Sequence, residues 1–441
     1  MSEYKALIRL GIPVLITQLG IIILSFADTM MVGTYGVDQL AAAAFVNSLF
    51  FIPIVMQLGF AGGLTPLIGA LFTQGDNLQT GRMLRAGVQG NAFLAVGLTV
   101  VMGIIYFFLD RFGQPSELLP LIRSYYLIIL ASLLPMAVFN AFQQTCNGIN
   151  DTSLPMWMIL ASNVLNILGN YLFIFGHLGC PELGLDGAGY STLFARYFGC
   201  IVLFIIFTHK KRYRRYMHGF HDGNALGELR RRVWTTSYPL MIQSGIECGL
   251  WSLGAVVSGW FGKVQLAAFQ VVNTMSQLGF MTFISFGVAA SIRVANYTGV
   301  NDFPGIRRAT SAALRLNLGL ATLASLIFWF GGAHLIHIFS RDSAVIASGL
   351  TLILPLVVYQ YMDATQLTYI NAIRGTSHVK PLLWISIAAY IIIGTPSMLL
   401  LAKGLDLGNV GVYWSFNIAL LAAAMLAVIV YRRTLTDLDW S

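Results

Sequence analysis

Residues 41–73 read AAAAFVNSLFFIPIVMQLGFAGGLTPLIGALFT and contain no charged side chain. A helix that crosses the hydrocarbon core of a bilayer needs about 20 mostly apolar residues, so this stretch is long enough to span. The preceding run from Leu10 to Val32 has a single charge, Asp28. In lipid only helices and closed barrels satisfy their backbone polar groups, and barrel strands would alternate apolar and polar residues. These runs do not alternate, so we predict membrane-spanning helices.

The composition excludes a soluble globular protein. Hydrophobic residues make up 57% of the chain and charged residues 10%, against roughly 45–50% and about 25% in soluble domains. The net charge of +8 does not indicate nucleic-acid binding, because the basic residues lie between the apolar runs, where the positive-inside rule expects them. The four cysteines have no paired spacing, so we expect neither a disulfide framework nor a zinc site.

The apolar runs predict an all-α polytopic membrane protein of twelve spans. The first run is too long for the apolar region of a signal peptide and lacks a small-residue cleavage site, so we expect it to remain as a span. Short connections leave no room for an inserted soluble domain. The predicted spans lie near residues 10–32, 41–72, 88–109, 119–145, 155–176, 187–208, 234–260, 266–292, 310–332, 345–370, 382–402 and 410–431.

The distribution of basic residues predicts the orientation. With twelve spans, 20 Lys and Arg residues fall on the side that holds both termini, and five fall on the other side. Lys and Arg accumulate on the cytoplasmic side of membrane proteins. Both termini are therefore expected in the cytoplasm.

The chain also repeats itself. Residues 33–42 (GTYGVDQLAA) match residues 259–268 (GWFGKVQLAA) at an offset of 226 positions. The repeat predicts two parallel six-span lobes, residues 1–208 and 233–441, around a site for substrate and coupling ion. A basic cytoplasmic linker, residues 209–232, joins them, and its charges could also contact anionic lipid headgroups. The same offset pairs Pro13 with Pro239, Asn47 with Asn273, Phe60 with Phe286 and Pro155 with Pro381.

Three acids lie inside the predicted spans: Asp28, Glu247 and Asp363. A charged side chain at the bilayer centre costs roughly 2.5–3.5 kcal/mol on insertion scales. None of the three has an acidic counterpart at the repeat offset, so the scaffold does not require them. They are therefore predicted to be functional. The one basic residue deep in a span, Arg196, could instead pair locally or reach a headgroup region.

Buried carboxylates favour the chemistry of cations. Burial destabilises the anion unless a proton or another cation accompanies it. Glu247 and Asp363, from two spans, could enclose a hard cation such as sodium. Tyr359 lies one helical turn before Asp363 and could add an aromatic or phenolic contact, although packing alone is an equally good reading.

The N-terminal lobe offers amides in place of a second acid. Asn166 and Asn170 share a helix face and could hydrogen-bond Asp28 or help to coordinate an ion; ordinary hydrogen bonding between helices is the alternative. Pro13 and Pro239 could kink the first span of each lobe or simply be tolerated by packing. No Walker loop, zinc helix or serine elbow is present, so neither ATP-driven pumping nor hydrolysis is indicated.

Several of these residues resemble one known family. Ala27-Asp28-Thr29-Met30-Met31-Val32-Gly33, the Gln39-Leu40-Ala41-Ala42 motif with its repeat, Glu247 and Asp363 are similar to the multidrug and toxic compound extrusion (MATE) transporters, in particular their NorM-like branch. The resemblance implies two six-helix lobes around a central cleft. It also implies a cation site at Glu247, Asp363 and Tyr359, and an N-lobe proton, ion or substrate site at Asp28, Asn166 and Asn170.

By that resemblance the expected activity is antiport, in which cationic and often aromatic drugs leave in exchange for sodium or, less favoured, protons. We expect a multi-pass monomer in a bacterial-type inner membrane, with no cofactor, no obligate protein partner and no enzymatic activity. A lipid-linked oligosaccharide flippase is the main alternative, disfavoured by three intramembrane acids against one arginine. An intramembrane prenyl transferase would need closely spaced acids, which the spans lack.

Overall fold

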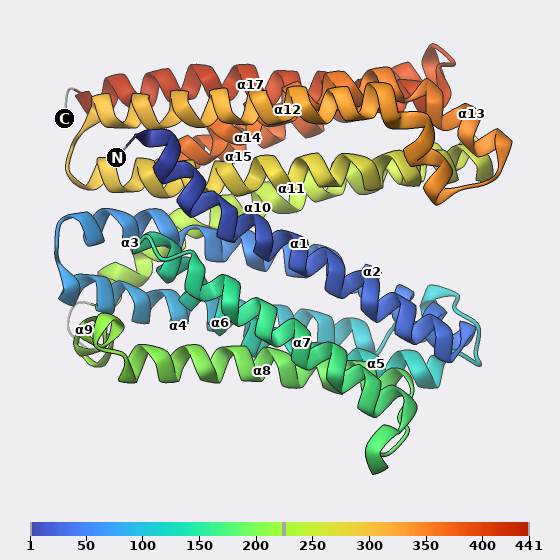
Figure 1. Ribbon diagram of the computed structural model, residues 1–441, viewed down its shortest axis with the longest axis horizontal. Helices are drawn as coiled ribbons and strands as arrows, with labels where there is room; N and C mark the ends of the chain where they lie inside the picture. Colours follow the sequence, from blue (N-terminus) through green and yellow to red (C-terminus); the bar gives the residue numbers. More distant parts are fainter. Residues whose placement is uncertain (1, 223–225, 440–441) are drawn as a thin grey trace. The chain divides into compact units, whose positions relative to one another are not determined.

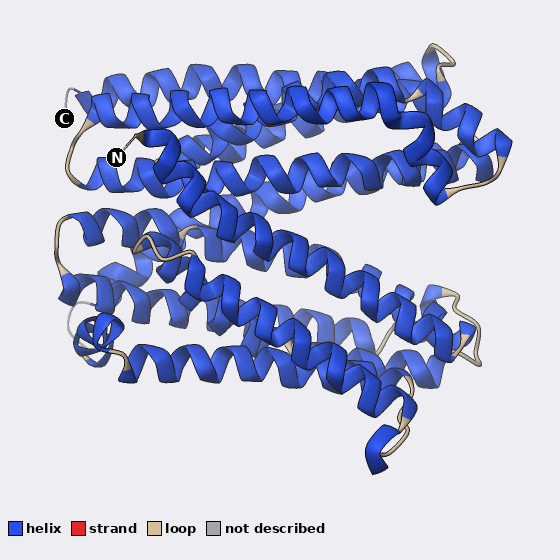
Figure 2. Cartoon of the chain, viewed as in Figure 1, coloured by secondary structure: helices blue, strands red, loops and turns tan. Residues whose placement is uncertain are grey.

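The computed structural model describes residues 2–222 and 226–439, and every regular element in that part of the chain is helical (Figure 2). The first half contains α1 (Glu3–Tyr35), α2 (Val37–Gly62), α3 (Leu64–Thr73), α4 (Asn77–Tyr106), η1 (Leu109–Phe112), α5 (Leu119–Ala131), α6 (Leu133–Gly148), α7 (Ser153–Phe175), η2 (His177–Gly179), α8 (Leu185–His209) and α9 (Lys211–His221). The second contains α10 (Leu226–Trp260), α11 (Lys263–Gly299), α12 (Phe303–Phe339), α13 (Ser343–Thr351), α14 (Ile353–Gly375), α15 (Lys380–Ser386), η3 (Ile387–Gly394), α16 (Thr395–Leu399), η4 (Leu400–Gly404) and α17 (Gly408–Asp439).

The helices confirm the predicted all-α polytopic fold. By length and composition, 11 helical segments of the described chain are able to cross a membrane, and the pair α13 and α14 brings the total to as many as 12. That pair is bent by 47° at its break. Pro355 lies in the first turn of α14, where its missing N–H costs no helical hydrogen bond. The predicted span at 345–370 is therefore a broken one.

The sequence repeat corresponds to a repeat of local structure. Two pairs of helices begin at the repeat offset: α2 with α11, and α4 with α12. The side chain of Asp76 caps α4 by accepting from Gln79 N at 2.9 Å, and Asp302 caps α12 by accepting from Gly305 N at 2.8 Å. The residues before these caps, Gly75 and Asn301, both have positive φ (76° and 56°). Glycine and asparagine are the residues that adopt this conformation most readily.

The chain divides into two compact units by contacts. One comprises Ile16–Met241, and the other comprises Met1–Leu15 with Ile242–Ser441. The units therefore differ from the predicted lobes, residues 1–208 and 233–441. The first part of α1 belongs to one unit and the rest of α1 to the other, and α10 is divided in the same way. The two division points are themselves 226 residues apart. Pro13 and Pro239 lie inside α1 and α10, two residues before these points. The repeat boundaries stay a prediction, since contacts measure packing rather than duplication.

The predicted linker, residues 209–232, contains a packed helix. Tyr213, Tyr216 and Met217 of α9 are buried, and α9 packs against α4 within the unit Ile16–Met241. The hydroxyl of Tyr213 donates to Asp151 at 2.5 Å. Burial, together with this carboxylate, raises the pKa of Tyr213, so the phenol stays neutral and remains a donor. Residues 223–225 of the linker lie outside the described residues.

Helix α14 is the central element of the second unit. It packs against α11, α12 and α17 (Figure 1). Helix α14 buries a row of polar side chains where an apolar core would be expected, and buried polar groups usually mark function inside a membrane. These side chains are Gln360, Asp363, Gln366, Thr368 and Asn371.

Candidate functional site

The two acids of the predicted cation site lie in one compact unit. Glu247 comes from α10 and is half-buried, whereas Asp363 comes from α14 and is 1% exposed. The two carboxylates are close enough to repel each other. Asp363 Oδ2 has no hydrogen-bond partner in the described part of the chain. Two like charges brought together away from water favour the uptake of a cation.

Further acceptor oxygens surround the acids. The side-chain oxygens of Gln360 and Gln366, one turn before and after Asp363 on α14, are buried and have no partner within residues 2–222 and 226–439. Native proteins leave few buried polar atoms unpaired, and an unplaced ion is one accepted reason for the exceptions. Carboxylate and amide oxygens are the ligands that hard cations prefer. In the same ranges no three His, Cys, Asp or Glu residues cluster closely enough to hold a metal ion, so the candidate site consists of a pair of acids and neutral oxygens.

Tyr359 lies near the acids and packs against an aromatic neighbour. It is 5% exposed, and its ring meets Trp251 edge-on with centroids 5.6 Å apart. The electrostatic influence of both Asp363 and Glu247 reaches its hydroxyl. In the part of the chain that the structure describes, no hydrogen bond joins the Tyr359 hydroxyl to Glu247 or Asp363. The structure thus brings the three predicted residues together, while their role in binding a cation stays a prediction.

Three neighbours of this site were absent from the sequence prediction. Gln366 Nε2 donates to Tyr390 Oη at 2.8 Å, and Tyr390 in turn donates to Glu247 Oε1 at 3.5 Å. Arg374 lies three turns after Asp363 on α14 and attracts Glu247 electrostatically. The helical spacing of Gln366 and Arg374 from Asp363 was a usable signal, but Arg374 was counted with the cytoplasmic charges. Nothing in the sequence points to Tyr390.

The predicted N-lobe residues also meet, within the unit Ile16–Met241. Asn170 Nδ2 donates to Asp28 Oδ1 at 2.6 Å. The Asn166 amide has one orientation in which both of its atoms find partners. In that orientation Asn166 Nδ2 donates to Asp28 Oδ1 at 2.9 Å, and Asn166 Oδ1 accepts from Thr192 Oγ1 at 3.0 Å. Two amide donors therefore hold one carboxylate oxygen. This arrangement orients the acid and leaves its other oxygen available.

Arg196 belongs to the same group. It extends from α8 and donates to Ser132 Oγ at 2.5 Å. Its charge and that of Asp28 attract each other. Of the two readings left open for Arg196, local pairing is the one that this geometry supports.

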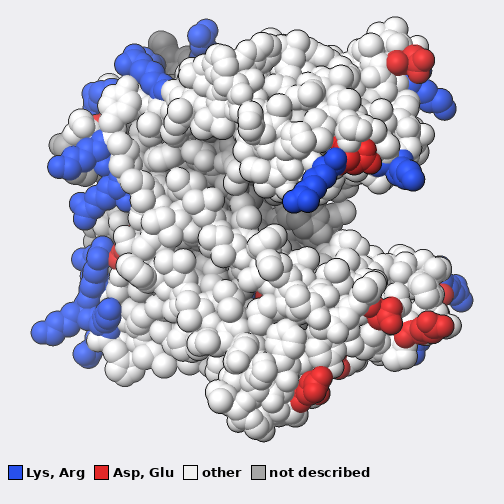
Figure 3. Space-filling view, turned by 45° about the vertical axis from the view of Figure 1, so that its right-hand side comes forward, with Lys and Arg blue, Asp and Glu red and all other residues white. Residues whose placement is uncertain are grey.

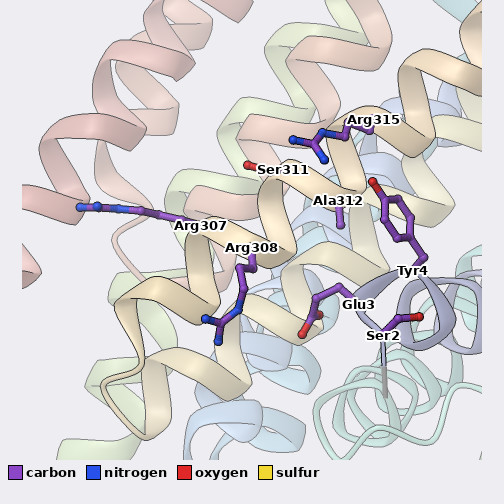
Figure 4. Close-up of a pocket in the computed structure, with 8 residues that line it drawn as sticks. All are labelled: Ser2, Glu3, Tyr4, Arg307, Arg308, Ser311, Ala312 and Arg315. Carbon is purple, nitrogen blue, oxygen red and sulfur yellow. The ribbon is translucent and has the colours of Figure 1, made fainter.

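An open pocket of about 460 Å³ lies at the start of α1 and is a poorer candidate (Figure 4). The guanidinium groups of Arg307, Arg308 and Arg315 point in different directions there rather than toward one centre. Glu3 is engaged by Arg293 at 3.0 Å. The pocket is therefore a basic surface without converging ligands. Its lining residues are Ser2, Glu3, Tyr4, Arg307, Arg308, Ser311, Ala312 and Arg315.

Comparison with known proteins identifies the family. The sequence profile of the MatE family matches residues 13–172 and 239–400, one segment in each half. The chain belongs to the MatE family. Its members are transporters, which agrees with the expectation that the chain is not an enzyme.

Similar sequences cover nearly the whole chain. A probable multidrug resistance protein NorM from Bradyrhizobium diazoefficiens is 27% identical over 437 residues, covering 98% of this chain and 93% of the relative. A protein of the same description from Neisseria meningitidis is 26% identical, covering 97% and 94%. These relatives place the chain with the NorM-like MATE transporters, as the sequence motifs predict.

Solved structures share the fold. The crystal structure of a eukaryotic MATE transporter, AtDTX14, superposes with a TM-score of 0.88 at 18% identity, covering 99% of this chain and 98% of the other. The Vibrio cholerae MATE transporter VcmN, in a mutant form, gives a TM-score of 0.87 at 20% identity, covering 100% and 99%. At this level of identity the likeness concerns the fold alone.

Proposed function

We propose that this protein exports cationic, often aromatic, organic compounds in exchange for an inward cation, sodium rather than a proton. The observation that carries the proposal is that half-buried Glu247 and buried Asp363 lie near each other among acceptor oxygens that have no donor within the described residues. Such a site gains stability by taking up a cation, and paired carboxylates with neutral oxygens suit sodium. The NorM descriptions of the relatives support drugs as the exported compounds.

The cycle follows from charge. Entry of the coupling cation neutralises a carboxylate and thereby favours the conformation in which the drug leaves; departure of that cation to the cytoplasm restores the empty acids. Each net charge that moves inward through a potential of 100 mV supplies about 2.3 kcal/mol. This is enough for roughly fifty-fold accumulation, because 1.4 kcal/mol is tenfold. Exchange of one sodium ion for one monovalent drug moves no net charge, so it would depend on the sodium concentration gradient.

Efflux of ethidium from proteoliposomes tests the proposal. We expect an imposed sodium gradient to drive efflux, and Glu247→Gln to abolish sodium-driven efflux while leaving the protein folded. Arg231→Gln, an exposed residue of the same helix, is the control and should transport normally. Efflux that follows only an imposed proton gradient would overturn the sodium part of the proposal. Absence of efflux under both gradients would overturn the exporter and favour the flippase.

The proposed setting is a bacterial-type inner membrane with both termini in the cytoplasm, and a monomeric protein without an obligate partner. Figure 3 shows most of the visible Lys and Arg at one end of the helices, while a few of them lie at the other end together with most of the visible Asp and Glu. This distribution supports the orientation through the positive-inside rule.

A further inference from the structure

The helical segment that follows α15 departs from α-helical geometry beside the cation site. Residues Ile387–Gly394 (η3) are π-helical, between α15 and α16. Well under 1% of residues in proteins are π-helical, and such turns occur frequently at functional sites. Pro396, at the start of α16, gives a local reason, because it has no N–H to donate to the carbonyl four residues earlier and its ring crowds that carbonyl. The π turns change the direction in which the side chains of η3 point.

Tyr390, in the middle of η3, is directed at the acids. It is 1% exposed, and Thr395 Oγ1 donates to its carbonyl oxygen at 3.0 Å, which closes the turn. The hydroxyl accepts from Gln366 Nε2 at 2.8 Å and donates to Glu247 Oε1 at 3.5 Å. Because the amide of Gln366 engages a lone pair, the hydroxyl hydrogen is left to face the carboxylate. Gln366 and Tyr390 thus form a directed pair ending at Glu247.

A hydroxyl donor and a coupling cation make opposite demands on the same oxygen. Hydrogen bonds to an ionised group stabilise the ion, so the hydroxyl of Tyr390 stabilises Glu247 without a cation. A cation that binds Glu247 Oε1 must replace this contact. The bond is long at 3.5 Å and therefore weak, so it would moderate cation binding rather than prevent it.

We propose that Tyr390 is a positioning residue that competes with the coupling cation for Glu247 and so promotes release of that cation. The inference rests on the proposed function and adds to it the residue that sets the affinity of the site. Without the hydroxyl, Glu247 would hold the cation more tightly. Efflux would then saturate at lower sodium, and turnover would fall because release is slower.

The experiment is sodium-driven ethidium efflux from proteoliposomes, measured over a range of sodium concentrations for wild type and Tyr390→Phe. The phenylalanine keeps the ring and removes only the hydroxyl. We expect the half-maximal sodium concentration to fall about five-fold in Tyr390→Phe. The change should be less than tenfold because the hydrogen bond that is lost is long and weak. We also expect a lower maximal rate, and a thermal unfolding midpoint lowered by no more than the loss of one buried hydrogen bond.

A further variant separates positioning from packing. Tyr413→Phe is the matched control, since Tyr413 is also buried in this unit but its hydroxyl makes no hydrogen bond with Glu247 or Asp363 among the described residues; its half-maximal sodium should equal that of wild type.

The outcomes distinguish this inference from the proposed function. Wild-type protein without sodium-driven efflux would contradict the proposed function, and the inference with it. Sodium-driven efflux in wild type with an unchanged half-maximal concentration in Tyr390→Phe would overturn the inference alone. A higher half-maximal concentration would also overturn it, because the hydroxyl would then be a ligand of the cation rather than its competitor.

Discussion

At the scale of single residues, Asp28 and Arg196 are opposite charges within the unit Ile16–Met241. Two amides hold one oxygen of Asp28, and the hydroxyl of Ser132 holds Arg196. Asp28 and Arg196 attract each other without forming an ion pair in the structure, and removal of one of two such charges leaves the other uncompensated, which costs more than removal of both. The pair therefore makes a prediction about stability that is separate from transport.

We expect Arg196→Gln to destabilise the protein by about 1–3 kcal/mol, less than for a fully buried pair because both side chains are half-buried. Asp28→Asn combined with Arg196→Gln should recover most of the loss. The measurement is thermal unfolding in detergent, with Arg231→Gln as a control that should leave the midpoint unchanged. A double variant as unstable as the sum of the two single ones would show that the charges do not interact.

At the scale of helices, α9 depends on glycines for its approach to α4. A Cβ atom on Gly219 would collide with the backbone carbonyl of Leu78, and one on Gly81 would collide with that of Tyr216. Neither neighbour is a flexible side-chain end, so the helices would have to separate. These contacts hold the apolar face of α9 against α4. The sequence predicted only a basic linker for this segment.

Gly219→Ala should therefore destabilise the unit Ile16–Met241 by about 1–3 kcal/mol through overpacking. Gly97→Ala is the matched control, because a Cβ atom there meets nothing within 4 Å. In a helix interior alanine is favoured over glycine by roughly 0.5–1 kcal/mol, so the control should be neutral or slightly stabilising. Thermal unfolding compares them; equal effects of the two substitutions would refute the close packing of α9.

At the scale of the whole molecule, the distribution of charge predicts sidedness. The predicted orientation places the loop after α7, which contains the half-buried and free Cys180, on the outside and Ser2 in the cytoplasm. A variant that retains only Cys180 should react with a membrane-impermeant maleimide in intact cells. Ser2→Cys without native cysteines should react only after permeabilisation. The reverse pattern would contradict the orientation.

The class of the protein, its repeat and its intramembrane acids could all be predicted from the sequence. Long apolar runs require helices because lipid offers the backbone no partners, and each of the predicted spans has its counterpart in the structure. Asp28, Glu247 and Asp363 could be found because a charge inside a span is costly. Asn166 and Asn170 followed from helical spacing, which is a local property of the chain.

The groups that meet those acids could not be predicted, because they depend on how the helices pack. Tyr390 comes from a different helical segment than Glu247, and a π-helical stretch directs it, so neither periodicity nor spacing indicated the contact. The sequence predicted Arg374 as a cytoplasmic charge, whereas in the structure the Arg374 side chain on α14 is attracted to Glu247 on α10. Pairing between helices depends on packing across elements far apart in sequence, and that information is distributed over the whole fold rather than contained in any one segment.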